Sequence, residues 1–119
     1  MRRTKITMSE RIKIGEKISL IIPDNPGVIE KNAVRIFEKR LMDRCRCSIE
    51  KVHASKYDNR NLCGYPIYIG SIRSNSAVSQ IINKHNLSSA NQPDGYLLYI
   101  GNSAVVSGFD ENGTLYGLG

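Results

Sequence analysis

Residues 17–41 read KISLIIPDNPGVIEKNAVRIFEKRL, and this stretch decides the fold class. Its first part, Lys17 to Ile22, alternates with the period of a β-strand, in which successive side chains leave opposite faces. Ile18, Leu20 and Ile22 share one face, whereas Ser19 and Ile21 share the other, so one face is apolar and the second partly so. Pro23 follows and ends the strand, because proline cannot donate to a sheet ladder.

The second part of the stretch has the period of an amphipathic helix. Ile29, Ala33, Ile36, Phe37 and Leu41 fall at i, i+4, i+7, i+8 and i+12, which places them on one stripe. We expect the helix to begin at Asn25-Pro26, with the asparagine as N-cap and the proline at the first helical position. A stripe of this kind favours packing on a sheet over a cofactor or partner groove.

Outward from this unit, the chain shows a second helix and four further strand-like runs. The second helix has Ser74 or Asn75 as its N-cap, and Asn86 is suited to a left-handed stop. Its inner stripe consists of Val78, Ile81, Ile82 and His85. The strand-like runs are 47–54, 66–72, 96–100 and 104–109, and Gly101-Asn102-Ser103 joins the last two as a short hairpin connection.

The order of these elements predicts an α/β (α+β) fold: a single mixed sheet of about five strands with two helices packed on it. The near-continuous apolar run at 66–72 indicates a strand that is buried on both faces. We expect five side chains to be buried between helices and sheet: Ile36, Phe37, Leu41, Ile81 and Ile82.

Charge divides the chain into a basic N-terminal arm, residues 1–16, and a domain, residues 17–119. The net charge is +6, and residues 1–17 hold six of the 17 lysines and arginines against Glu10 and Glu16. A solvated arm explains this distribution, and an arm that binds nucleic acid or acidic lipid is the alternative. The start of the chain lacks the apolar run of a signal peptide. A secreted or periplasmic parent protein is still compatible with this sequence if its signal peptide has been removed.

The cysteines and histidines of the chain give little support for a metal site or a catalytic nucleophile. Cys45, Cys47 and Cys63 are odd in number, no C-x-x-C occurs, and His53 and His85 are the only histidines. A zinc site would need a fourth ligand, so no cofactor or metal is predicted. No nucleophile elbow, phosphate loop or dinucleotide fingerprint is present either.

The remaining polar candidates are two carboxylates and six tyrosines. Asp110 and Glu111 are adjacent in a predicted turn with Gly113 suited to positive φ, so they are expected to point apart rather than act as an acid–base pair. Tyr57 and Tyr65 lie in or beside a polar loop and are the candidate exposed contacts for a sugar ring. Tyr68, Tyr96 and Tyr99 lie in apolar strands and are more consistent with core or sheet-surface positions.

The C-terminal third carries a resemblance to a known group of domains. Asp94-Gly95-Tyr96-Leu97-Leu98 begins a strand, Ala104-Val105-Val106-Ser107-Gly108 forms its partner, and Asp110-Glu111-Asn112-Gly113-Thr114-Leu115-Tyr116-Gly117-Leu118 closes the unit. This pattern resembles the small N-terminal domain of retaining β-N-acetylhexosaminidases of glycoside hydrolase family 20. Similar domains precede the barrels of bacterial α-glucuronidases and hyaluronidase-like O-GlcNAc hydrolases. Their closing phrase is acidic-x-x-Gly-x-x-Tyr/Phe-Gly, and the resemblance covers roughly residues 17–119.

The resemblance implies a zincin-like topology without the zinc motif and a non-catalytic accessory role in a carbohydrate-active enzyme. The families' catalytic carboxylates lie in the barrel, so none is carried onto Asp110 or Glu111. Leu115, Tyr116 and Leu118 would dock a connecting helix against that barrel, which is the partner in cis. This chain itself is then not an enzyme, although its parent is a glycoside hydrolase. The basic arm and the missing barrel depart from the pattern.

Two further expectations stand beside this one. A freestanding binding module, with its basic arm on nucleic acid or another polyanion, is the alternative function. The segment from Thr114 to Gly119 is too short for a stable helix and contains two glycines. We therefore expect that end to be frayed or held by a neighbouring molecule, with self-association through its apolar side chains.

Overall fold

A computed structural model describes residues 17–46, 48–58, 64–87, 95–101, 103–108, 110, 113–114 and 118. The elements follow the order β1 (Lys17–Ile22), α2 (Val28–Cys45), β2 (Ser48–His53), a short 3₁₀ turn η1 (Ala54–Lys56), β3 (Tyr65–Ile69), α3 (Ser76–Lys84), β4 (Tyr96–Ile100) and β5 (Ala104–Gly108). No helix in these ranges is long and apolar enough to cross a bilayer.

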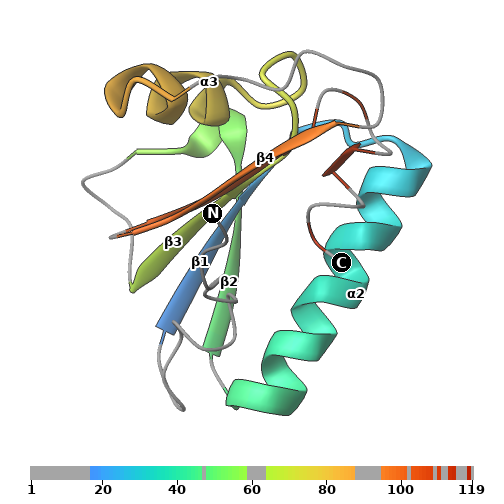
Figure 1. The fold of residues 1–119 in the computed structure, drawn as a ribbon. Helices are drawn as coiled ribbons and strands as arrows, with labels where there is room; N and C mark the ends of the chain where they lie inside the picture. Colours follow the sequence, from blue (N-terminus) through green and yellow to red (C-terminus); the bar gives the residue numbers. More distant parts are fainter. Residues whose placement is uncertain are drawn as a thin grey trace, which may run out of the picture.

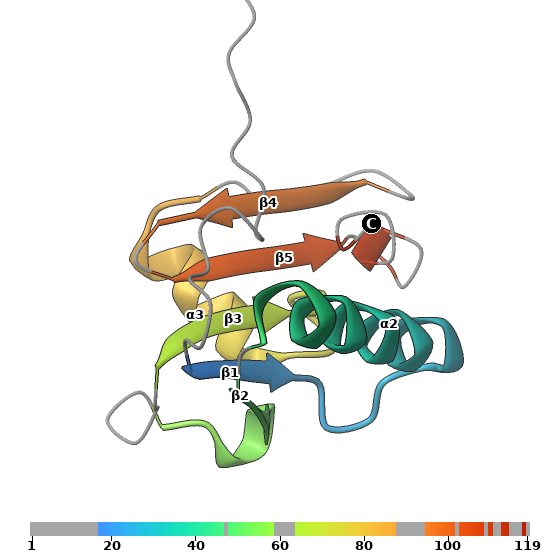
Figure 2. The same cartoon turned by 90° about the horizontal axis from the view of Figure 1, so that it is seen from below.

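The strands form a five-stranded mixed sheet in the order β2-β1-β3-β5-β4. β1 pairs in parallel with both β2 and β3, β3 pairs in parallel with β5, and β4 runs antiparallel to β5 (Figure 2). The predicted sheet and the hairpin around residue 101 are therefore confirmed. The parallel pairs require crossover connections, and α2 supplies the one between β1 and β2.

The two helices cover opposite faces of the sheet (Figure 1). Ile18, Leu20 and Ile22 of β1 pack in one core cluster with α2, whereas Ile21 packs in the other with α3. Successive side chains of β1 therefore pack into two separate cores on opposite faces of the sheet. The chain forms a three-layer α/β/α sandwich. β3 is buried on both faces, as predicted, because it lies between two parallel neighbours and under both helices.

Helix α2 is rotated relative to the predicted stripe. Phe37 and Leu41 are buried as expected, but Ile36 is 47% exposed and Ile29 is 41% exposed, so the prediction for Ile36 is wrong. Glu30 and Val34 take the inner positions instead. Each residue turns the helix by about 100°, so Ile36 cannot share the centre of the inner face with its neighbour Phe37.

The helix ends differ in how well the sequence predicted them. α2 begins at Val28 with Gly27 as N-cap and without a side-chain cap bond, so Asn25 is not the cap. α3 has Asn75 as its N-cap, one of the two expected residues, and Asn86 adopts the left-handed conformation with φ 54°. Ile81 and Ile82 are buried on the inner face of α3, as predicted.

Candidate functional site: a cationic cavity at the strand ends

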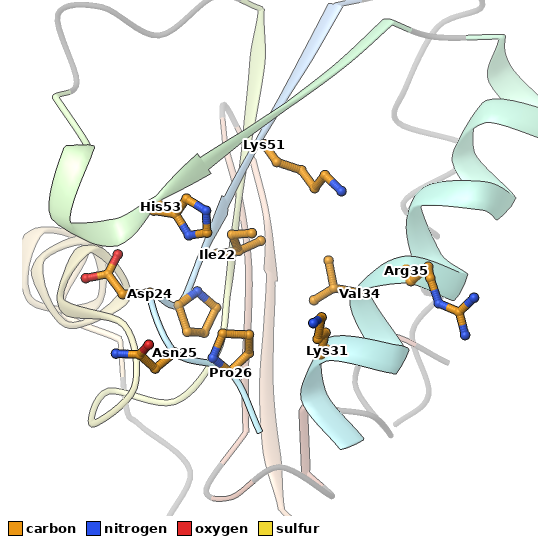
Figure 3. Close-up of a pocket in the computed structure, with 10 residues that line it drawn as sticks. Ile22, Asp24, Asn25, Pro26, Lys31, Val34, Arg35, Lys51 and His53 are labelled. Atoms are coloured by element: carbon orange, nitrogen blue, oxygen red, sulfur yellow. The ribbon is translucent and has the colours of Figure 1, made fainter. Parts of the chain in front are cut away.

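A cavity of about 500 Å³ lies where strands β1 and β2 end beside helix α2 (Figure 3). β1 ends at Ile22 and β2 at His53, and these two residues are register partners in the parallel ladder. In open α/β sheets, ligands bind beyond the carboxyl ends of the strands, which is where this cavity opens. Its walls are formed by Ile22, Pro23, Asp24, Asn25, Pro26, Lys31, Val34, Arg35, Lys51 and His53.

Basic side chains from two elements meet at the cavity. Lys31 and Arg35 are four residues apart on α2, so they lie on the same side of the helix. Lys51 and His53 are two residues apart on β2, so they leave the sheet on one face, and Lys51 binds Glu38 of α2 with 3.2 Å between Nζ and Oε1. In Figure 3, Lys31 and Lys51 project toward the cavity, whereas the guanidinium of Arg35 turns away from it.

Asp24 is the one carboxylate among the described residues of the cavity wall, and its role is local. The backbone N–H of Ser55 donates to Asp24 Oδ1 at 3.0 Å. This bond is the main reason that the pKa of Asp24 lies below its ordinary value; the charge of His53 acts in the same direction, and desolvation opposes both. Asp24 therefore ties the loop after β1 to the turn after β2.

The cationic side chains of the cavity attract anions. Its described lining does not contain the catalytic pair of groups that would cleave a glycosidic bond. Lys31 and Lys51 project toward the cavity, Arg35 lines it with its guanidinium turned away, and the floor is apolar, with Ile22, Pro23 and Val34 buried. Within the described part of the lining, no second carboxylate stands beside Asp24 to form the pair that glycoside hydrolysis needs. Among the described residues, no group of three or more metal-ligating side chains comes together.

The two tyrosines predicted as exposed sugar contacts lie elsewhere. Tyr65 is 4% exposed, and its hydroxyl donates to the carbonyl of Gly101 at 3.0 Å, so the prediction of an exposed platform is wrong for this residue. It is the first residue of a central strand and turns into the core on the α2 side. Tyr57 is partly exposed, but its ring packs edge-on against Tyr68.

The residues expected at an interdomain contact are only partly described. Leu115 and Tyr116 lie outside the described residues. Leu118 is 7% exposed and belongs to the core cluster under α2, so the side chain predicted to dock another domain is already buried in this one. Thr114 is fully buried as well, so these two residues offer no apolar surface for self-association.

Asp110 behaves as a turn residue. Its Oδ1 accepts from the N–H of Gly113 at 2.8 Å, and its carbonyl accepts from the N–H of Thr114 at 3.1 Å. These bonds are the local backbone interactions that the sequence predicted for it, whereas Glu111 lies outside the described residues. Gly113 sits in a helical turn rather than at the positive φ expected of it.

The two histidines lie far apart in the sequence and have different roles. His53 lines the cavity, whereas His85 caps the end of α3 and stacks on Tyr99 with ring centroids 5.2 Å apart. The packing role expected for His85 is therefore confirmed. Cys47, Cys63 and the side chain of Cys45 lie outside the described part of the chain, as do residues 1–16 of the basic arm.

Comparison with known proteins identifies the fold. No protein-family model matches the chain, and no curated protein matches it in sequence. Among solved structures, the chain is similar to a family GH115 4-O-methyl-α-glucuronidase with specificity for decorated arabinogalactans. The match has a TM-score of 0.69 at 17% identity and covers 90% of this chain. The chain spans only 13% of that glucuronidase, so the similarity is to one small segment of a much larger protein.

Sequence reasoning missed the cavity because its members are spread along the chain. Lys31 lies in the first predicted helix and Lys51 in the predicted strand 47–54, and His53 was considered only as a metal ligand or a catalytic partner. A usable signal was present: Asp24 and His53 stand at the carboxyl ends of two predicted strands, and parallel strands bring such ends to the same edge. The parallel pairing of those two strands was the missing information.

Proposed function

We propose that this chain is a non-catalytic accessory domain of a carbohydrate-active enzyme and packs beside a catalytic barrel in the same polypeptide. The observation that carries the proposal is the fold match: nearly all of this chain superposes on a small segment of a glycoside hydrolase. That relation favours a role as one domain among several. The α-glucuronidases were also among the families that the closing phrase of the sequence resembles.

The outer face of α2 is the surface best suited to contact the rest of such a protein. Val28 is 77% exposed, Ile29 41% and Ile36 47%, and their helical positions fall within an arc of about 100°. Large exposed apolar side chains that share one face of a helix are a common feature of interfaces. We propose that this face of α2, rather than Leu118, contacts the catalytic barrel.

The gene that encodes this chain provides the first test. We expect the reading frame to include roughly 300 further residues downstream that alternate between strands and helices, as a (β/α)₈ barrel does. A frame without a catalytic domain would contradict the accessory role. It would favour the freestanding polyanion-binding module, for which deletion of residues 1–16 should abolish binding to a labelled oligonucleotide.

The activity of the chain alone provides the second test. The described residues supply no acid–base pair, so we expect no turnover of nitrophenyl N-acetylglucosaminide or nitrophenyl glucuronide. Asp110→Asn and Glu111→Gln are the decisive variants, because they change the only adjacent carboxylates of the closing phrase. Turnover that persists through purification and disappears in either variant would overturn the non-catalytic assignment.

A further inference from the structure

The cationic cavity at the ends of β1 and β2 has the size and chemistry of a binding site for a small molecule. Its volume of about 500 Å³ falls within the range of about 300–1,000 Å³ that is usual for ligand pockets. A monosaccharide fits in such a space, whereas a folded partner does not. The cavity is also built from three separate segments, the loop after β1, helix α2 and strand β2, which fix its walls relative to one another.

The charge of the cavity selects for an anion. Its described lining holds Lys31, Arg35 and Lys51 and a single carboxylate, Asp24. Asp24 is engaged by the backbone of Ser55, and Lys51 is engaged by Glu38. With Glu38 counted as well, the cations exceed the carboxylates by one only if Arg35 is included, and its guanidinium turns away from the cavity. Lys31 has no carboxylate within ion-pair distance among the described residues, so its ammonium is available to a ligand.

The floor of the cavity has a different character from its rim. Ile22, Pro23 and Val34 are buried beneath it, and Pro26 adds a partly buried ring at one side. The apolar surface left open comes from the partly buried ring of Pro26 and the edges of Ile22 and Val34, which are 9% and 6% exposed. It suits the C–H face of a sugar ring, while the ammonium groups of the rim suit an oxyanion carried by the same molecule. A bare inorganic ion would use the rim and leave the floor uncovered.

We infer that this cavity binds a sugar-sized molecule bearing an oxyanion, with the ring against Pro26 and the exposed edges of Ile22 and Val34 and the oxyanion between Lys31 and Lys51. The sugar part of this inference rests on the proposed function; the oxyanion part rests on the cavity alone. A carboxylate and a phosphate share the chemistry that the two lysines recognise. Arg35 points away and contributes only its longer-range field.

The test is a titration of the full chain followed by two-dimensional NMR of the backbone amides. The probes are glucuronate, glucose 6-phosphate, inorganic phosphate and neutral glucose. We expect glucuronate or glucose 6-phosphate to bind in the millimolar range, to shift the amides of Ile22, Val34 and His53, and to bind more tightly than either glucose or inorganic phosphate. The two sugar probes decide whether the oxyanion is a carboxylate or a phosphate.

A pair of charge variants gives the matched control. Lys31→Gln combined with Lys51→Gln should weaken binding by about three- to tenfold, because each partly exposed ion pair contributes on that scale. Lys39→Gln removes the same charge from an exposed position of α2 outside the cavity and should leave the affinity unchanged. Thermal unfolding of each variant checks that the fold is retained.

Several results would overturn the inference. These are the absence of saturable shifts at the cavity with both sugar probes, equal affinity for neutral glucose, or equal loss of binding in Lys39→Gln. Tighter binding of inorganic phosphate than of either sugar probe would contradict the apolar floor. Lysine-dependent binding in a protein whose gene encodes no hydrolase would refute the accessory role and leave the oxyanion site standing, so the two proposals fail separately.

Discussion

The side-chain nitrogen of Asn75 donates to the carbonyl oxygen of Ile21 at 3.0 Å, across 54 residues of sequence. The same nitrogen donates to the carbonyl of Ile69 at 2.8 Å, and the side-chain oxygen accepts from the N–H groups of Ala77 and Val78. One fully buried side chain therefore joins two parallel strands to the start of α3. It also satisfies strand-end carbonyls that burial removes from water.

Replacement of Asn75 by alanine should destabilise the domain strongly. The lost helix cap costs about 0.5–2 kcal/mol, and each buried carbonyl left without a donor costs about 1–3 kcal/mol. Asn75→Asp should be no better, because aspartate keeps the cap but turns a second acceptor toward the carbonyls of Ile21 and Ile69. Chemical denaturation measures both effects. Asn83→Ala, on the exposed side of the same helix, is the control and should be nearly neutral.

Local pattern predicted the elements of this fold, but long-range contact decided how they are used. The alternation of Ile18, Leu20 and Ile22 correctly indicated a strand with two different faces. It did not reveal that the faces belong to separate cores, because that depends on which side each helix crosses. Asn75 was expected as a cap from its position before α3. Its bond to Ile21 had no signal in the sequence, since nothing local relates residues that far apart.

The rotation of α2 has a similar cause. Ile29 and Ile36 were assigned to the inner stripe because they are apolar, and Glu30 was not part of that stripe. The structure buries Glu30 to 2% exposure and leaves both isoleucines partly exposed. Hydrophobic pattern alone could not have found this, because charged residues are seldom buried. The cavity was missed for the related reason that Lys31 and Lys51 come together only through the parallel pairing of β1 and β2.

The corrected orientation of α2 predicts unequal effects for neighbouring residues. Phe37→Ala should reduce the free energy of unfolding by about 3–5 kcal/mol, since it leaves a cavity in the core under the helix. Ile36→Ala should cost less than about 1 kcal/mol, because surface substitutions have small effects. Parallel urea denaturation of the two variants decides between the orientations. Equal losses would restore the stripe that the sequence suggested.

The contact between Tyr57 and Tyr68 predicts an unusual tyrosine titration. Their hydroxyl oxygens are 2.8 Å apart, and Tyr68 is 3% exposed. Burial, and then the hydrogen bond to Tyr57, raise the pKa of Tyr68 well above its ordinary value of 10.0. A raised folded-state pKa means that its contribution to stability is complete below pH 10 and is lost as the pH rises toward the folded-state pKa.

Absorbance at alkaline pH measures this effect directly. Of the six tyrosines, Tyr68 should remain protonated above pH 10 until the protein unfolds. Tyr57→Phe removes the hydrogen-bond partner and should lower stability at neutral pH by about 0.5–1.5 kcal/mol. Tyr96→Phe, at a 42% exposed position, is the control and should leave the alkaline behaviour of Tyr68 unchanged. Titration of all tyrosines as one class would contradict the buried pair.

The closing phrase of the chain depends on two glycines that pack backbone against backbone. A Cβ at Gly113 would overlap the carbonyl oxygen of Gly95, and a Cβ at Gly108 would overlap the backbone nitrogen of Thr114. Neither neighbour is a flexible side chain that can move aside. The hairpin end and the turn held by Asp110 can therefore meet only where side chains are absent, which is a physical reason for the glycine in acidic-x-x-Gly.

Gly113→Ala should consequently destabilise the domain by about 1–3 kcal/mol or more, because an overpacked site forces the backbone to shift. Gly101→Ala is the matched control: its Cβ would meet the hydroxyl of Tyr99 at 2.7 Å, and that side-chain end can move. Its cost should be clearly smaller. Thermal unfolding compares the two, and amide shifts of Gly95 and Thr114 report the displaced contact. If both alanines are tolerated equally, the close approach at Gly113 does not hold this end of the domain together.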